Sequence, residues 1–249
     1  MTDFIAVSEV SRELKNSAEL IKSLMIHALI IGENGTGKKS LAKYIAHDAT
    51  IYQAKEFQGD VVDNVVNISD VTIIVEDIDQ ITNIDLFVSF IETNNIKLLA
   101  TTKKDDLNDS LKALFSITLE IPPLEFRKED IKPLATKFSK EAGAVLGIET
   151  KPSKLIINTK NNAHSLRKSI YFSYLFESIG ENEIMMLLEK HMMDNMQGEN
   201  GYRDFLYLFE APLLKSSQKK YKSQVQMARH LGLNRITLRK KLEIHKELL

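Results

Sequence analysis

The chain has 249 residues, a formal net charge of −1 and no cysteine. This length allows one large domain or two unequal ones, and the lack of cysteine excludes disulfide frameworks and thiolate metal sites. No apolar run approaches the roughly 20 residues that span a bilayer, and the acidic N-terminus lacks the apolar core of a secretory signal, so we expect a soluble, cytoplasmic protein with no membrane partner.

Four short apolar runs in the first half of the chain are typical of buried strands. They cover residues 27–31, 71–79, 96–102 and 117–121, and helical patterns follow the first two runs at 40–49 and 84–94. Strands that alternate with helices predict an α/β fold in which a parallel sheet is covered on both faces. Pro122 and Pro123 should end this sheet, because adjacent prolines break strand pairing.

The rest of the chain is predicted to be helical. Helices are expected near residues 128–142, 152–159, 163–178 and 182–194, then over 203–220 and in two shorter segments. The fourth contains a cluster of methionines, which we interpret as the core of this helical region. The patterns predict an α/β part (1–123), a helical part (124–195), a polar linker with two glycines (196–202) and an all-α part (203–249).

The loop after the first predicted strand has the sequence of a phosphate-binding loop. Residues 32–38 read GENGTGK and lie between a strand and a helix, which is the context that gives such a match meaning. Glycines let the backbone amides approach phosphates, and Lys38 can reach the β- and γ-phosphates. The alternative is a glycine-rich turn that binds nothing. The expected nucleotide contacts are Gly32, Glu33, Asn34, Gly35, Thr36, Gly37, Lys38, Lys39 and Ser40.

Two acidic residues close the second predicted strand, in the sequence IIVED. We expect Glu76 to coordinate Mg²⁺ through the bound nucleotide and Asp77 to polarise the attacking water. A negative strand end in an ordinary loop is the alternative, and the pair gains weight only beside the phosphate loop. Lys39 follows Lys38, at the position where a serine or threonine usually holds magnesium.

The C-terminal part is basic. Residues 203–249 hold 11 Lys and Arg against 4 Asp and Glu, a balance of +7 that leaves −8 on the rest of the chain. Gly232 permits a sharp turn, Asn234 can cap the helix that follows, and Leu238 and Leu242 can pack that helix back. This pattern favours a helix-turn-helix that binds DNA over a helical hairpin with a basic surface. The expected DNA contacts are Asn234, Arg235, Thr237, Arg239, Lys240 and Lys241.

These segments together resemble the bacterial enhancer-binding proteins, the NtrC-like AAA+ activators of sigma-54 RNA polymerase, which end in a Fis-type helix-turn-helix. GENGTGKK is similar to the family's GESGTGKE, which also lacks serine or threonine after the lysine. IPPLEFRKEDIKPLATKF resembles the family's LPPLRERxEDIxxLaxxF, and LGLNRITLRKKL is similar to the Fis-type LGINRNTLRKKL at nearly every position. The resemblance implies a P-loop NTPase with a helical lid at 124–195, whose sensor arginine falls on Arg167.

Several features of that family are missing from this sequence. No GAFTGA loop, which touches the sigma factor, occurs between Lys38 and Glu76, which lie only 38 positions apart, and the acidic pair is inverted to Glu then Asp. The family's sensor asparagine falls on Lys103, and its arginine fingers fall near Leu107 and Ala113. An arginine finger is worth about 10³–10⁵ in rate in GTPases, so we expect nucleotide binding with at most weak ATPase activity.

The resemblance and these departures imply a DNA-binding transcriptional regulator with a divergent AAA+ domain. ATP or ADP, with Mg²⁺, would be its structural or regulatory ligand. Its expected partner is double-stranded DNA, bound by a homodimer that forms through the C-terminal domain, with RNA polymerase or a full-length relative as further candidates. Two alternatives stay open: an active ATPase that activates transcription, and a modulator that joins assemblies of full-length relatives.

Overall fold

The computed structural model describes residues 4–103 and 107–249. By their internal contacts these form two compact units, Met1–Ser178 and Ile179–Leu249. The boundary at Ser178 lies inside the region 124–195 that the sequence assigns to one helical part. Within the described residues, no helix is long and apolar enough to cross a membrane.

The first unit is built on a five-stranded parallel sheet. Its strands lie in the order β2-β3-β4-β1-β5, and every neighbouring pair is parallel. The strands are β1 (Ala28–Ile31), β2 (Thr50–Gln53), β3 (Thr72–Glu76), β4 (Lys97–Thr102) and β5 (Ile117–Glu120). Four of them fall within the predicted runs, and the sheet ends before the two prolines as expected. β2 was not predicted, because this edge strand is short and only partly buried and so lacks an apolar signal.

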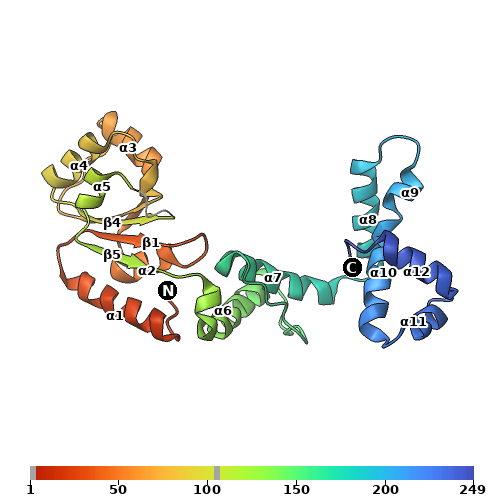
Figure 1. Ribbon diagram of the computed structural model, residues 1–249. Coiled ribbons are helices and arrows are strands. Elements are labelled where there is room, and N and C mark those ends of the chain that lie inside the picture. The colour runs from red at the N-terminus through yellow and green to blue at the C-terminus, as the bar shows by residue number, and fades with distance from the viewer. Residues whose placement is uncertain (1–3, 104–106) are drawn as a thin grey trace. The chain divides into compact units, whose positions relative to one another are not determined.

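Helices cover both faces of the sheet, as predicted (Figure 1). α1 (Glu9–Ser23) and α2 (Lys38–Ile45) pack on one face, and their cluster includes Ala18, Ile21 and Leu41. The other face is covered by α3 (Ala54–Val62), η1 (Ile78–Gln80), α4 (Ile84–Thr93) and α5 (Asp109–Ala113), around Phe57 and Phe87. The β-branched and leucine side chains of the central strands are buried from both sides, which is the usual environment of a parallel sheet.

After η2 (Leu124–Phe126), two long helices, α6 (Lys128–Leu146) and α7 (Asn162–Ser178), pack against each other. The prediction of a helix at 152–159 is wrong, because this segment has no helical turn. Side chains of α7 take up its backbone donors instead, since the amide of Ile156 donates to Ser173 Oγ at 2.8 Å and that of Asn158 donates to Ser169 Oγ at 3.2 Å. These bonds replace the ones that a helix would form internally.

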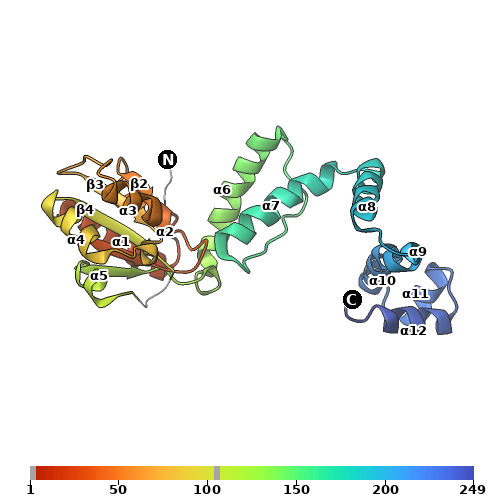
Figure 2. The same ribbon diagram turned by 90° about the horizontal axis from the view of Figure 1, so that it is seen from above.

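The second unit is all helical (Figure 2). It contains α8 (Glu181–Asn195), α9 (Gly201–Phe205), α10 (Tyr207–Lys220), α11 (Gln224–His230) and α12 (Arg235–Ile244). Its core gathers Leu214, Met227, Ala228 and Leu238 from α10, α11 and α12. The interpretation of the methionine-rich helix as core is wrong, because α8 has no buried residue. The single helix predicted over 203–220 is divided into α9 and α10.

Candidate functional site

The loop between β1 and α2 has a backbone that depends on glycine. The strand ends before it and the helix begins after it, as predicted. Gly35 and Gly37 have φ angles of 77° and 104°, a region that residues with a side chain rarely adopt. Gly32 is constrained differently, because a Cβ there would lie 2.7 Å from the carbonyl oxygen of Ile121. The tight turn that the sequence predicts is therefore present.

The start of α7 braces this loop. The amide of Ala163 donates to the carbonyl of Gly35 at 3.0 Å. Asn162 Nδ2 donates to the carbonyl of Asn34 at 3.0 Å and to Glu33 Oε2 at 3.1 Å, across 128 and 129 positions of sequence. The start of α7, which lies within the region expected to act as a lid, is therefore in direct contact with the expected phosphate loop.

A buried ion pair joins the loop to α6 and to the N-terminal segment. Arg127 Nη2 donates to the carbonyl of Thr36 at 2.9 Å, and Arg127 Nη1 lies 3.4 Å from Asp130 Oδ2. Both charged side chains are almost completely buried. Asp130 accepts further hydrogen bonds from Val7, Ser8 and Ser11.

The carboxylate of Asp130 keeps its charge in spite of burial. Burial alone would raise its pKa, but the hydrogen bonds from Ser11, Ser8 and Val7 and the charge of Arg127 outweigh that effect and hold the pKa below its usual value. The pair therefore stays ionised at neutral pH and is fully hydrogen-bonded, which is the condition under which buried charges are tolerated. Sequence reasoning recorded these residues only as part of a family motif, because their partners lie far away in the chain.

A cleft of about 500 Å³ opens beside the loop. Lys38 lies in it, and its Nζ donates to the carbonyls of Gly32 at 2.6 Å and Glu33 at 2.9 Å. Burial lowers the pKa of Lys38, against the opposing charges of Asp77 and Glu76. The predicted nucleotide contacts that line the cleft are Asn34, Gly35, Gly37, Lys38, Lys39, Ser40 and Arg167.

Gly32, Glu33 and Thr36 form the hydrogen bonds within the loop. Their backbone carbonyls accept from the side chains of Lys38 and Arg127, and Thr36 Oγ1 donates to the carbonyl of Glu33 at 3.0 Å. These three residues therefore shape the loop, while the other predicted contacts line the cleft.

The two predicted catalytic acids, Glu76 and Asp77, face lysines across the same cleft. Glu76 Oε2 accepts from Lys39 Nζ at 2.9 Å and from Gln53 Nε2 at 2.8 Å. The second contact comes from the strand that the sequence did not reveal, since β2 pairs with β3 so that Gln53 lies opposite Glu76. Asp77 has a φ of 53°, and its Oδ1 lies 3.9 Å from Lys103 Nζ.

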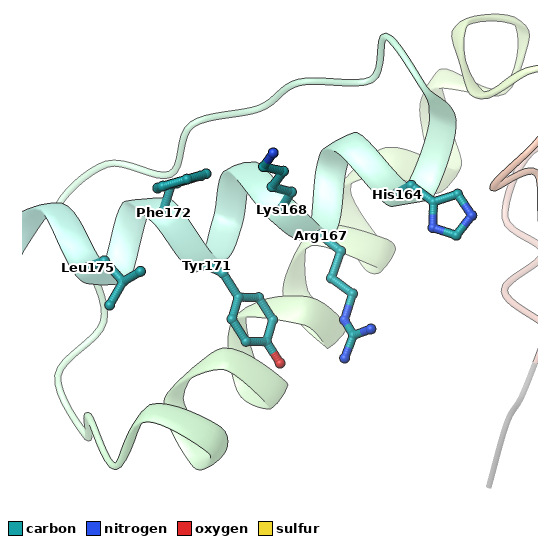
Figure 3. A pocket seen from close by; sticks show the side chains of 6 residues that line it. All are labelled: His164, Arg167, Lys168, Tyr171, Phe172 and Leu175. Carbon is teal, nitrogen blue, oxygen red and sulfur yellow. The ribbon is translucent and has the colours of Figure 1, made fainter. Parts of the chain in front are cut away.

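Arg167, the predicted sensor arginine, lines the cleft and also a second cavity of about 440 Å³ along α7. Its guanidinium pairs with Glu141 of α6. In Figure 3, Arg167 and Tyr171 project to one side of α7, and Lys168 and Phe172 project to the other. The helix therefore brings one cation to the loop while packing an aromatic ring beside it.

The two C-terminal helices are capped and joined as the sequence predicts. Asn234 Oδ1 accepts from the amide of Thr237 at 2.7 Å at the start of α12. Gly232, in the turn before it, has a φ of 65°. Leu238 is completely buried and Leu242 packs against the same cluster. α12 is thus held against α11 by its leucines, with the opposite face left to solvent.

The basic residues of α12 divide into two groups. Arg235, Arg239 and Lys240 are exposed, and none of the ion pairs formed among the described residues involves them. Lys241 instead pairs with Glu210 of α10, whose other oxygen lies 2.9 Å from His245 Nε2. Lys241, then His245, holds the pKa of Glu210 below its usual value in spite of partial burial. This cluster fixes α12 on α10 and turns Lys241 away from the exposed group.

Residues 5–124 match the family model of the sigma-54 interaction domain. The whole chain is similar in structure to NtrX from Brucella abortus: in the complex with ATP the TM-score is 0.58 at 15% identity, and without a named ligand it is 0.61 at 14% identity, with 98% of this chain and 69% of that chain covered in each case. A mutant of RuvB from Thermotoga maritima gives a TM-score of 0.52 at 19% identity, over 94% of this chain and 85% of that one.

No curated protein sequence matches the chain. At these identities the similar structures show the fold alone, which is that of an AAA+ P-loop NTPase with its five-stranded parallel sheet. The family model supplies the family, since its match spans the phosphate loop, the acidic end of β3 and the residues up to Leu124. Residues 5–124 therefore belong to the family of sigma-54 interaction domains, and they have the AAA+ fold.

Proposed function

We propose that this protein is a DNA-binding transcriptional regulator whose AAA+ part holds ATP or ADP as a structural or regulatory ligand. The observation that carries the first half is the cleft in which the glycine loop, Lys38 and Arg167 meet. Backbone amides at a helix N-terminus and two cations are suited to a polyphosphate. NtrX from Brucella abortus has been crystallised with ATP and with ADP, which supports the same ligand class here.

A smaller cavity beside the loop, with a partly apolar lining, suits the base of the nucleotide. It has a volume of about 100 Å³ and adjoins Gly35, Thr36 and Gly37. Its apolar lining comes from the N-terminal segment, η2, α6 and α7, through Phe4, Ile5, Leu124, Leu134, Phe138 and Ala163. A ligand that spans both cavities would bridge the sheet and the helical region, and its binding would stabilise their contact.

Efficient hydrolysis is not part of this proposal. The family's arginine fingers fall near Leu107, which is buried, and Ala113, and neither residue is basic. The position of the sensor asparagine carries Lys103, whose ammonium lies near Asp77. Residues 63–71 link α3 directly to β3 and contain no GAFTGA sequence. We therefore propose a regulator that differs from a standard sigma-54 activator and is at most a weak ATPase.

Replacing Lys38 by alanine is expected to weaken ADP binding by at least about 100-fold. The change removes the charge that reaches the phosphates and also the two hydrogen bonds that close the loop, at about 1.5–3 kcal/mol for each bond to a charged group. Titration of a fluorescent ADP into both proteins measures the difference. Lys55→Ala, an exposed lysine of α3 outside the cleft, is the matched control. Equal affinities of wild type and Lys38→Ala would remove the nucleotide from the proposal.

We also propose that α11 and α12 bind double-stranded DNA. Capped helices joined by a glycine turn, with exposed Arg235, Arg239 and Lys240 on the second helix, form a helix-turn-helix in which α12 enters the major groove. Asn234, Arg235 and Thr237 stand at its N-terminus, where base edges are reached, and Arg239 and Lys240 are placed for phosphates. We assign Lys241 a weaker contact, because Glu210 already holds it.

Arg239→Ala is expected to lower the affinity for duplex DNA and to reduce the steepness of its salt dependence by about one in a plot of log K against log salt. The reason is that the variant makes one phosphate contact fewer, so its binding releases about one counterion fewer. Lys154→Ala, an exposed lysine of the first unit, should leave the slope unchanged. Fluorescence anisotropy of a labelled duplex over a range of salt concentrations measures both slopes, and an unaltered slope in Arg239→Ala would contradict the placement of α12.

We further propose that the second unit forms a homodimer, so that two copies of α12 read a palindromic site about 34 Å apart along the DNA. RNA polymerase and a full-length relative remain alternative partners. Co-purification of a full-length relative with this protein would favour the modulator, and turnover of ATP that Lys38→Ala abolishes would favour an active ATPase.

A further inference from the structure

We infer that this protein binds its nucleotide without Mg²⁺, with Lys39 and Lys103 supplying the positive charge that a metal ion provides in related sites. The inference rests on the proposed nucleotide site and concerns the form of ligand that the site accepts. It replaces the expectation from sequence that Glu76 ligates Mg²⁺.

The first observation is that the carboxylate of Glu76 already forms an ion pair with Lys39. Its Oε2 accepts from Lys39 Nζ at 2.9 Å and from Gln53 Nε2 at 2.8 Å, and the carboxylate is only 17% exposed. Mg²⁺ demands a near-ideal octahedral set of oxygen ligands and gives up its water reluctantly. A metal ion would have to displace an ammonium that is tethered one residue from Lys38. The carboxylate on β3 is thus arranged as a partner of Lys39.

The second observation is that the other expected ligands do not fit a metal either. Asp77 lies 3.9 Å from the ammonium of Lys103, and the Asp79 carboxylate accepts from Thr102 Oγ1 at 2.9 Å. The residue that follows Lys38 is Lys39, where the similar GESGTGKE loop has a glutamate, and an ammonium offers a metal ion no oxygen.

The third observation is the charge of the cleft. Its lining contains Lys38, Lys39, Lys103 and Arg167 against the carboxylates of Glu76 and Asp77. The lining therefore carries an excess of two positive charges, which equals the charge of one Mg²⁺ ion. A polyphosphate that enters this cleft meets that charge on tethered side chains, and Lys39 needs only to move from Glu76 to a phosphate oxygen, a charge-assisted bond of the same kind.

The test compares the affinity of the purified full chain for a fluorescent ADP in excess EDTA and in millimolar Mg²⁺. We expect the two dissociation constants of the wild type to agree within about threefold, because the lysines supply the same positive charge in both conditions. In Lys39→Ser, which removes the ammonium and frees Glu76, affinity in EDTA should fall by at least tenfold, and Mg²⁺ should restore part of it. Lys55→Ser, on the exposed surface of α3, should behave as the wild type does.

The outcomes separate this inference from the proposed function. Tight binding by the wild type that is lost in EDTA would overturn the inference and leave the nucleotide site in place. An affinity in EDTA that Lys39→Ser does not change would also overturn it, because the charge would then come from another group. Binding in neither condition would overturn the nucleotide site itself. Thermal unfolding of each variant without ligand confirms that the loop region is folded.

Discussion

Replacing Asp130 by alanine is expected to lower the free energy of unfolding of the first unit by about 3–5 kcal/mol. The change leaves the buried guanidinium of Arg127 without its counter-charge and removes the acceptor for Val7, Ser8 and Ser11. For a unit of this size the loss corresponds to roughly 6–20 °C in melting temperature. Circular dichroism during thermal and urea unfolding measures it.

A matched control separates burial from ion pairing as such. Lys22 pairs with Glu19 at the same spacing of three residues, but at the surface of α1, so Lys22→Ala should cost only about 1 kcal/mol or less. Equal losses in Lys22→Ala and Asp130→Ala would contradict the assignment of the buried pair as a main tie between the loop, α6 and the N-terminal segment.

The same pair gives a dependence on pH with a definite sign. The pKa of Asp130 is lower in the folded state than in the unfolded chain, so the native state binds fewer protons near that pKa. Its contribution is therefore fully present above the unfolded pKa of about 3.9 and is lost as pH falls through the lower folded value. We expect the difference in stability between wild type and Asp130→Asn to be constant from pH 5 to 8 and to shrink below about pH 4.

Replacing Gly35 by alanine is expected to destabilise the first unit by about 2–4 kcal/mol and to abolish measurable nucleotide binding. The residue has a φ of 77°, and a Cβ would lie 2.8 Å from the ring of His164 and 2.9 Å from the carbonyl oxygen of Asn161. A backbone atom cannot turn aside as a side chain can, so the loop must separate from the start of α7. Urea unfolding and the fluorescent ADP titration report the two effects.

Two other glycines separate the two causes of this destabilisation, which are the backbone conformation and the steric clash of the added Cβ. Gly147 has a φ of 66° with open space around it, so Gly147→Ala should show the conformational cost alone, about 1–2 kcal/mol. Gly59 lies in α3 with nothing near it, and Gly59→Ala should stabilise the unit by about 0.5–1 kcal/mol. If Gly35→Ala cost no more than Gly147→Ala, the loop would not be braced by α7 in the way described.

Much of the fold could be predicted from sequence because its signals are local. The central strands are continuous apolar runs, and the phosphate loop is a short string whose glycines and flanking elements agree. α1 was missed although its signal is present: Ser8 caps it, and Leu14, Ala18 and Ile21 recur at helical spacing on its buried face. The prediction of a helix at 152–159 is wrong because serine side chains of α7 accept hydrogen bonds from the backbone amides of this segment. No local pattern in the sequence reveals these contacts.

The contacts within the candidate site were less predictable because they join distant segments. Glu76 was recognised as an acid at a strand end, but its partners depend on the pairing of β2 with β3 and on the reach of Lys39. Arg127 and Asp130 stand in a recognisable motif, yet Thr36, whose carbonyl accepts from Arg127, lies 91 positions away in the chain. Lys241 was grouped with its basic neighbours on charge alone, and only the packing of α10 against α12 pairs it with Glu210.

We propose above all that this AAA+ domain holds a nucleotide without turning it over efficiently, and single-turnover hydrolysis tests this most directly. The purified full chain in excess over radiolabelled ATP, with and without duplex DNA and with Lys38→Ala as the control, would be sampled over an hour. We predict that the bound ATP is recovered largely intact, because the family's arginine fingers fall near Leu107 and Ala113, which are not basic, and because Asp77 faces Lys103. Conversion to ADP within seconds, absent in Lys38→Ala, would contradict the account and show that another group supplies the missing charge.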